Sequence, residues 1–305
     1  MKKRLLLACL ALVSYFPQPA RAQFTDPLTY TNSPAGLNQL ELGYAYVHAN
    51  SSIDTSIVIA NANVNLNQGT LDYTRYFGLL HRLMWVEAAV PVAGLSGSVS
   101  GTTIQGSTIG AGDSSYSVAM LLKGGPALSV SQFESYEPET TLGVSFTMTA
   151  PTGSYDPNKI LNLGSDRWSF KPEAGLSCPF GLKQKWEFDA YGNVYFYTDN
   201  SSYRGREILR QQPLPGVEAH LSYAFTERVY SSLDTRYSFR GTTSVGGVDQ
   251  DNPQRNFILG TELNVSLNRR NALILEFARA LVHRNGPALT GFSVRYDYLW
   301  GRNYR

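Results

Sequence analysis

The chain is poor in cysteine and in charged side chains, and both shortages narrow its class. Its 305 residues include two cysteines, Cys9 and Cys178. Cys9 lies in an N-terminal segment that we expect to be removed, so one cysteine remains and a cysteine-stapled secreted scaffold is excluded. Charged residues make up 16% of the chain, below the roughly one quarter of soluble domains. The net charge of +2 gives no basic footprint, so no nucleic-acid partner is predicted.

Long apolar runs are also missing after the first 22 residues, which excludes a transmembrane helix of about 20 residues. The N-terminus itself has the order of a secretory signal peptide. A basic start at Lys2, Lys3 and Arg4 precedes an apolar run over residues 5–16, and "ARA" at 20–22 is a small-x-small cleavage site. We therefore predict a signal peptide at 1–22 and a single domain at 23–305. The "LLAC" before residue 10 looks like a lipoprotein box, but apolar residues continue beyond it, which favours cleavage after residue 22.

An exported chain of this composition is either a soluble β-protein or an outer-membrane β-barrel, and alternation favours the barrel. Residues 257–267 read FILGTELNVSL, in which mostly apolar odd positions alternate with Gly260, Glu262, Asn264 and Ser266. Such a period of two is typical of a strand with one buried face. Twelve segments share it, and most have the length that a tilted strand needs to cross a bilayer. They lie near 38–48, 62–77, 82–91, 114–123, 140–150, 167–178, 185–197, 214–225, 229–240, 255–268, 271–281 and 289–300.

The connections between these segments are alternately short and long, as in outer-membrane barrels. Short turns such as "FTER" and "NRRN" alternate with long stretches rich in Gly, Ser and Asn, at 49–62, 93–113, 150–172, 198–212 and 241–254. The connection at 124–139 should be short but is long, which suggests a small helix or a miscounted strand. The predicted fold is all-β, a transmembrane antiparallel up-and-down β-barrel of about twelve strands, in which closure pairs every backbone N–H and C=O.

The alternation also predicts which side chains line the lumen. Both charge signs occur on the inward faces, together with tyrosines, and no choice between a salt-bridged plug and a polar pathway follows from the sequence. The lumen-lining candidates are Lys171, Glu173, Glu187, Asp189, Tyr191, Glu218, His220, Asp234, Arg236, Glu262, Glu276, Arg295 and Asp297. Tryptophans and tyrosines near strand ends, among them Trp186 and Tyr296, are typical of girdles at the membrane interface.

No pattern points firmly to catalysis, a metal or a cofactor. Gly112-Asp113-Ser114 looks like the nucleophile block of some secreted esterases, but Gly and Asp before a strand are ordinary turn residues. His220 shares an inward face with Ser222, a pair that could be catalytic, although polar lining is the simpler interpretation. No His, Asp or Glu spacing fits a metal site, and no phosphate-binding glycine loop is present. We predict no enzyme, metal or cofactor, with an outer-membrane lipid or ester hydrolase as the alternative.

The stretch 150–172, APTGSYDPNKILNLGSDRWSFKP, is too irregular for a strand, and PTG, DPN and NLG mark tight turns. Pro172 falls inside a predicted strand, where it removes a ladder donor and predicts a bulge or a break. The PTG-x-Y-D and NLG-x-x-RW-x-F-x-P blocks here, with "GAGDSSYSVAMLLKGGPAL" before them and "QPLPGVEAHLSYAF" after, resemble the outer-membrane transporters associated with the meta-pathway of phenol degradation. Ser114 departs from the proline that the family often has after its Gly-Asp pair.

The resemblance implies an outer-membrane β-barrel in a Gram-negative bacterium, linked to the use of aromatic compounds and without catalytic residues to carry over. We expect passive passage of small hydrophobic or aromatic solutes, in contact with outer-membrane lipid and lipopolysaccharide; a purely structural barrel is the other alternative. The long loop could fold inward and constrict the lumen. The gating candidates are Pro151, Gly153, Tyr155, Asp156, Asn162, Gly164, Arg167, Trp168 and Pro172. The oligomeric state stays open.

Overall fold

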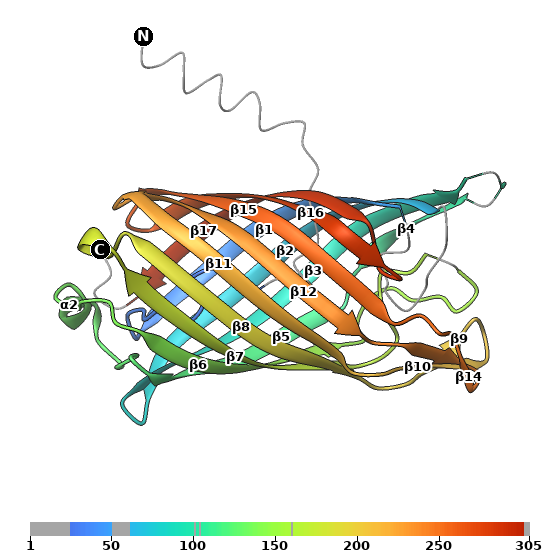
Figure 1. Cartoon of the computed structure of the whole chain (residues 1–305), viewed down its shortest axis with the longest axis horizontal. Coiled ribbons are helices and arrows are strands. Elements are labelled where there is room, and N and C mark those ends of the chain that lie inside the picture. Colours follow the sequence, from blue (N-terminus) through green and yellow to red (C-terminus); the bar gives the residue numbers. More distant parts are fainter. Residues whose placement is uncertain (1–24, 51–61, 101, 104, 160, 302–305) are drawn as a thin grey trace, which may run out of the picture.

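Long strands with one apolar face follow one another along the chain, and in the structure they close into a barrel (Figure 1). The computed structural model describes residues 25–50, 62–100, 102–103, 105–159 and 161–301. The predicted signal peptide at 1–22 and most of the predicted loop at 49–62 lie outside the described residues.

Within the described residues, twelve long strands form the wall. They are β1 (Leu37–Ala49), β2 (Ala62–Leu79), β3 (Arg82–Val99), β5 (Ser114–Lys123), β6 (Thr141–Ala150), β7 (Ser169–Phe180), β8 (Trp186–Tyr197), β11 (Leu214–Thr226), β12 (Val229–Arg240), β15 (Gln254–Asn268), β16 (Asn271–Arg284) and β17 (Leu289–Gly301). Each pairs antiparallel with its neighbours along the chain. The first strand pairs with the last, from Leu37 opposite Gly301 to Ala49 opposite Leu289, and this pairing closes the sheet. The predicted up-and-down barrel is confirmed.

Each of the twelve predicted segments coincides with one of these strands, but the predicted loop at 93–113 is wrong. β3 continues to Val99, and β4 (Gln105–Ala111) returns along it from Ser98 opposite Gln105 to Val92 opposite Ala111. The composition of this stretch is that of a loop, yet its alternation persists, because Ala93 and Leu95 are buried while their neighbours are less so. Small Gly, Ser and Thr side chains therefore hide a strand signal here.

Two other long connections also contain strands where loops were predicted. β9 (Asn200–Tyr203) and β10 (Glu207–Gln211) lie between β8 and β11, and β13 (Thr243–Val245) and β14 (Val248–Asp249) lie between β12 and β15. They pair with one another in a separate sheet of four strands, in the order β14-β13-β10-β9. These strands are too short for alternation to show in the sequence. Figure 1 places β9, β10 and β14 together beyond one end of the barrel.

The two ends of the barrel differ in the length of their connections. We call the end at which β17 finishes, and which carries short turns such as Leu80–His81 and Glu227–Arg228, the turn end. The other end, with the four-stranded sheet, is the loop end (Figure 1). The long connection at 124–139 lies at the turn end and holds α2 (Val130–Phe133), where Ser129 and Gln132 form a capping box. A 3-10 helix, η2 (Leu182–Gln184), makes another turn. None of the described helices is long and apolar enough to span a membrane.

The outer surface of the barrel is apolar and the inner surface is polar. Outward side chains such as Leu71, Val217 and Leu233 are exposed, while inward ones such as Asp189, His220 and Arg295 are buried. Aromatic side chains, among them Trp186 stacked on Phe180 and Trp168 on Phe170, are exposed near strand ends. This pattern is the one that a lipid bilayer requires of a barrel wall.

A candidate binding chamber inside the barrel

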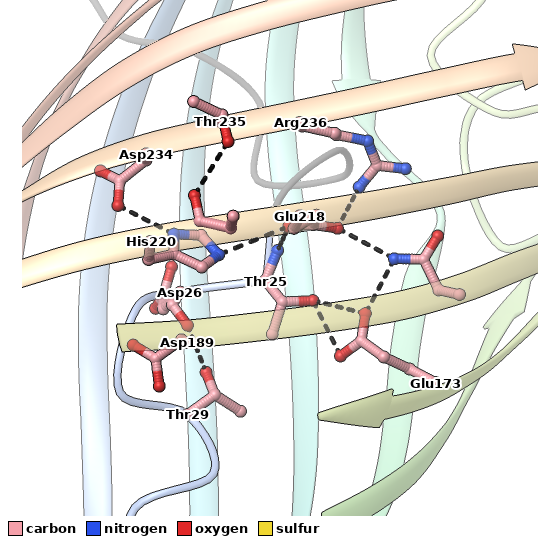
Figure 2. A network of polar contacts seen from close by, with 12 residues as sticks. Thr25, Asp26, Thr29, Glu173, Asp189, Glu218, His220, Asp234, Thr235 and Arg236 are labelled. Atoms are coloured by element: carbon pink, nitrogen blue, oxygen red, sulfur yellow. Dashed lines mark hydrogen bonds and ion pairs between the residues drawn. The ribbon is translucent and has the colours of Figure 1, made fainter. Parts of the chain in front are cut away.

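The chain enters the lumen before it joins the wall, and residues 25–36 form an N-terminal segment inside the barrel. Its first contacts are with inward carboxylates (Figure 2). The Thr25 backbone N–H donates to Glu218 Oε2 at 2.8 Å, and the Thr25 hydroxyl lies 2.8 Å from Glu173 Oε2. Leu28 N–H donates to Asp189 Oδ2 at 3.2 Å. Carboxylates on three neighbouring strands therefore hold the start of this segment.

Tyr30 fixes the segment farther along and is fully buried. Its ring lies 5.2 Å from that of Tyr191 and 6.0 Å from that of Trp85. Its hydroxyl lies within hydrogen-bond distance of Ser145 Oγ and Glu173 Oε1, at 2.9 and 3.0 Å. Burial, and the negative charge of Glu173, raise the pKa of the Tyr30 phenol far above its ordinary value, so the phenol stays protonated.

Gly143 and Gly175 of the wall make room for the Tyr30 ring. A Cβ built on Gly175 would lie 2.0 Å from a Tyr30 ring carbon, and one on Gly143 would lie 2.2 Å from another. Both glycines come from adjacent strands and are paired with each other. The wall is therefore shaped for an aromatic side chain at this place in the lumen.

The inward charges form ion pairs that also hold the N-terminal segment. Arg295 donates to Asp26 of the segment at 2.5 Å and to Glu262 of β15 at 2.5 Å. On β12, which pairs with β15, Arg236 donates to Glu218 at 2.6 Å, and Asn193 donates to Glu173 and to Glu218 at 2.9 Å each. Lys171 pairs with Glu173 at 3.2 Å. The network in Figure 2 thus joins four wall strands to residues 25–29.

The structure places all of the predicted lumen residues on the inner face, but it divides them into two groups. Lys171, Glu173 and Arg236 border an internal chamber. The others lie in or beside the network around the N-terminal segment, namely Glu187, Asp189, Tyr191, Glu218, His220, Asp234, Glu262, Glu276, Arg295 and Asp297. Most inward charges thus belong to the ion-pair network around the N-terminal segment, as in the salt-bridged plug that was one of the two alternatives, while a few border the chamber.

The long loop at 151–168 folds toward the lumen and is held by Asp113. One carboxylate oxygen of Asp113 accepts from Gly153 N–H at 2.8 Å, and the other accepts from Ser165 N–H at 2.8 Å and from the Ser165 hydroxyl at 2.6 Å. A single side chain therefore binds the outgoing and the returning limb of the loop. This is the structural role of the Gly112-Asp113 pair that looked like an esterase block in the sequence.

Asp113 reaches the loop because the wall is irregular at this point. The pairing of β3 changes register by one residue between Ala89–Ser115 and Val92–Ala111, which leaves an extra residue at Gly112–Asp113. Pro91 lies opposite, and its carbonyl accepts from Gly112 N–H at 2.9 Å. Proline is expected at such a bulge because it has no N–H for a regular ladder.

Glycines allow the two limbs of the loop to touch. A Cβ on Gly153 would lie 2.7 Å from Gly164 Cα, and one on Gly164 would lie 2.6 Å from the Gly153 carbonyl oxygen. Beyond this crossing, Leu161 and Leu163 pack against an inner apolar cluster that Leu66 of β2 and Leu95 of β3 help to form. The loop is therefore tied down at its base by hydrogen bonds and at its tip by apolar burial.

The predicted gating residues take different positions. Tyr155, Asn162, Gly164 and Arg167 border the chamber, and Asp156 forms an internal turn of the loop by accepting from Asn158 N–H at 2.9 Å. Pro151 and Gly153 lie at its base. Trp168 and Pro172 were predicted as part of the gate, but both are exposed on the outside of the wall, because the returning limb has rejoined the sheet there.

Pro172 interrupts the wall on one side only. β7 pairs with β6 without a gap, with Pro172 opposite Phe146. Its pairing with β8 lapses over Lys171 and Pro172 and resumes at Glu173 in the same register. The predicted break is present as a local loss of pairing, whereas a bulge is not.

Between the N-terminal segment and the loop lies a chamber of about 980 Å³. Leu66 of β2, with Trp85, Ala93 and Leu95 of β3, makes one side apolar, and Leu161 and Leu163 of the loop add to it. Lys171, Tyr195, Tyr197 and Arg236 line it from β7, β8 and β12. β2 and β3 lie across the barrel from β11 and β12, so the apolar side faces Arg236 of β12, and the tyrosines of β8 lie beside Arg236 in the lining.

His220 and Ser222, the pair that could be catalytic on sequence grounds, lie in the network and do not border the chamber. His220 Nδ1 lies 2.8 Å from Asp234 Oδ1, and Nε2 lies 4.0 Å from Glu218 Oε2. Neither Nε2 nor the Ser222 hydroxyl has a hydrogen-bond partner among the described residues. A catalytic serine is expected within hydrogen-bond distance of its base, so the geometry does not support His220 and Ser222 as a catalytic pair. The described residues also contain no group of three or more His, Cys, Asp or Glu side chains fit to bind a metal.

Three features of the site were missed in the sequence: the N-terminal segment, its anchor Tyr30, and the buried Trp85 of the apolar wall. The signal for the first was indirect. Residues 25–36, TDPLTYTNSPAG, precede the first alternating segment, contain two prolines and show no alternation of their own. Such a segment cannot be part of the wall, but nothing in it shows that it turns into the lumen.

The comparisons with known proteins bear directly on this geometry. A family model described as "Putative MetA-pathway of phenol degradation" matches residues 48–296. The chain belongs to this family. No curated protein sequence matches the chain.

Solved structures show the same fold at low identity. An outer membrane channel from Pseudomonas putida F1 is 22% identical, with 91% of this chain and 100% of the other covered and a TM-score of 0.77. The β domain of the Bordetella autotransporter BrkA is 10% identical, with 87% and 100% covered and a TM-score of 0.52. Family and fold together support an outer-membrane barrel channel, and the description of the first neighbour as a channel agrees with a role other than catalysis.

Proposed function

We propose that this family member resides in the bacterial outer membrane and lets small hydrophobic or aromatic compounds pass down their concentration gradient through the barrel. The observation that carries the proposal is the chamber of about 980 Å³ between the loop and the N-terminal segment. Its size and its mixed lining are those of sites that bind small organic molecules. Trp85, Tyr195 and Tyr197 come from two different strands of the lining, so a flat apolar solute would meet aromatic rings from more than one part of the wall.

The loop at 151–168 is the gate in this proposal. It closes the chamber on the side of the loop end through Leu161 and Leu163, and a single carboxylate holds its base. Hydrogen bonds and the packing of two leucines attach the loop to the wall, and these contacts can break and re-form without unfolding a wall strand. Passive movement fits the described residues, since none of them suggests energy coupling.

A sealed, purely structural barrel is the second candidate, and the N-terminal segment favours it. Tyr30 is fully buried and the ion pairs around Asp26 and Thr25 fill the lumen toward the turn end. Both candidates share the same closed geometry. They differ in whether the gate and the segment move, and a transport measurement decides between them.

The test compares uptake of radiolabelled toluene and phenol in cells that produce the wild type, a loop deletion, or no barrel. Removal of residues 155–163 needs only a local rearrangement to rejoin the chain, because Gly164 N–H already donates to the Ser154 carbonyl oxygen at 3.0 Å. The deletion keeps the Asp113 contacts to Gly153 and Ser165. We expect wild-type uptake above that of cells without the protein, and faster uptake through the deletion variant.

The double variant Leu161→Ser/Leu163→Ser is a second test of the gate, since it keeps the loop length and removes its apolar anchor. It should raise uptake in the same direction as the deletion. Equal uptake in all four strains, with each variant correctly folded in the outer membrane, would reject the transport function in favour of the structural barrel.

A further inference from the structure

Among the described residues, Arg167 differs from the other cations of the lumen in having no carboxylate partner. It is buried, with 5% of its surface exposed, and it borders the chamber. Nη2 donates to the neutral side chain of Gln211 at 2.7 Å, and the guanidinium lies 4.4 Å from the centre of the Tyr197 ring. Nη1 has no hydrogen-bond partner among the described residues.

The other inward cations show what is missing. Lys171 pairs with Glu173, Arg236 with Glu218, and Arg295 with Asp26 and Glu262. A buried charge without a counterion is costly, and proteins almost always pair such groups. The ring of Tyr197 offsets part of this cost, but it leaves the Nη1 hydrogens without an acceptor. The site therefore lacks one negative charge and one hydrogen-bond acceptor.

The surroundings indicate which kind of anion fits. Arg167 is the cation left to neutralise a bound anion. The other cations that border the chamber, Lys171 and Arg236, already form ion pairs, and Lys159 and Arg204 belong to exposed turns. The chamber therefore fits an anion with a single negative charge. Glu87 borders the chamber from β3, so it repels an anion from the apolar wall and directs it toward Arg167.

We propose that the chamber binds amphipathic organic carboxylates, with the carboxylate on Arg167 and the apolar body against Leu161, Leu163 and the β2–β3 wall. This inference rests on the proposed function and narrows its substrate class from apolar solutes in general to organic acids. An arginine–carboxylate contact is a charge-assisted hydrogen bond and is strongest where water is excluded. The apolar side of the chamber then supplies binding free energy from the rest of the molecule.

The probes are 2-naphthoate and 2-naphthol, which share their rings and differ in charge at pH 7. Binding to the purified, detergent-solubilised protein is measured by isothermal titration calorimetry. We expect wild-type protein to bind naphthoate at least about tenfold more tightly than naphthol. Arg167→Gln should weaken naphthoate binding by about tenfold and leave naphthol binding unchanged, whereas Arg210→Gln, an exposed arginine of β10 paired with Asp199, should change neither.

Gln211→Glu is a second variant that does not depend on removing the arginine. It places a carboxylate where Gln211 Oε1 now accepts from Arg167, and thus supplies the missing partner from within the protein. It should abolish the preference for naphthoate in the same way. Folding of every variant is checked by its heat-dependent migration on a gel.

Equal affinity of the wild type for both probes, or no binding of either, would overturn this inference. So would a preference for naphthoate that both Arg167→Gln and Gln211→Glu retain. None of these results touches the proposed function, because uptake of toluene and phenol is measured separately and needs no charged group.

Discussion

Removal of the Asp113 carboxylate should release the loop at 151–168 while the barrel stays intact. Asp113→Ala deletes the acceptor of three hydrogen bonds, two from backbone N–H groups and one from the Ser165 hydroxyl. Each contributes about 1 kcal/mol net, so the variant should favour the released loop by about 3 kcal/mol. At about 1.4 kcal/mol per factor of ten, the population of the released state rises roughly a hundredfold.

Limited proteolysis measures this population. Lys159 lies in the loop and offers a trypsin site, and cleavage there follows the fraction of molecules in which the loop is released, provided that reclosure is faster than cleavage. We expect tryptic cleavage after Lys159, identified by mass spectrometry of the membrane-embedded protein, to accelerate by about two orders of magnitude. Gel migration without boiling should still show a folded barrel, since Asp113 lies at a bulge and not within a regular ladder.

Asp249→Ala is the matched control. Asp249 is an exposed acid of β14 at the same end of the barrel, and it accepts from Asp251 N–H at 2.8 Å without contacting the loop. Its replacement should leave cleavage after Lys159 unchanged. A cleavage rate of Asp113→Ala within twofold of the wild type would refute the reasoning, because it would mean that Leu161 and Leu163 hold the loop without the carboxylate.

Three further predictions concern the N-terminal segment at 25–36, the titration of its Tyr30 phenol, and the lipid face of the wall. Tyr30→Ala should raise single-channel conductance in planar bilayers, because it removes a buried ring whose loss from a protein core costs about 3–5 kcal/mol; unchanged conductance would mean that the segment does not block the lumen. Since the pKa of Tyr30 is raised in the folded state, the protonated phenol stabilises the N-terminal segment at pH values below the ordinary tyrosine pKa of about 10, and this stabilisation is lost as the pH rises beyond it. Wild-type conductance should therefore be flat from pH 6 to 9 and rise above pH 10. Tyr30→Phe should not show this rise. Leu263→Lys, on the lipid face, should impair membrane insertion by about 2–4 kcal/mol, and Leu267→Lys, near the strand end, by no more than about 1 kcal/mol, measured by refolding into liposomes; equal insertion of both variants would contradict the assigned faces.

The wall of this barrel could be predicted from the sequence because its rule is local. Alternation needs only neighbouring residues, and it assigns Glu262 to the lumen and Leu263 to the lipid face without knowledge of any partner. The same rule failed at 93–113, where glycine and serine carry little apolar signal although Leu95 faces inward. Local patterns thus fix the strands and their faces wherever side chains differ enough in polarity.

The contents of the lumen could not be predicted because they depend on contacts between distant parts of the chain. Thr25 meets Glu173 across 148 residues, and Arg167 meets Gln211 across 44. Alternation shows that Glu173 points inward, but it does not say whether a cation, the N-terminal segment or a solute is its partner. Those partners are set by the curvature of the closed wall and by the path of residues 25–36, neither of which has a signature in neighbouring residues.

The loop and the N-terminal segment bound the chamber, and they are held with different strength. This difference sets the order of the steps in transport. Withdrawal of the N-terminal segment exposes the buried Tyr30 ring, at a cost of about 3–5 kcal/mol, and removes Asp26 from Arg295, which keeps Glu262 as a partner. Release of the loop breaks the three hydrogen bonds to Asp113 and those that Asn200 donates to Tyr155 and Ser165, and it exposes two leucines, but it separates no ion pair among the described residues. The loop therefore opens more often, so a solute from the loop end fills the chamber quickly and leaves past the N-terminal segment slowly. In stopped-flow measurements on proteoliposomes, binding should be faster than flux, and Tyr30→Ala should accelerate flux while leaving the binding rate unchanged.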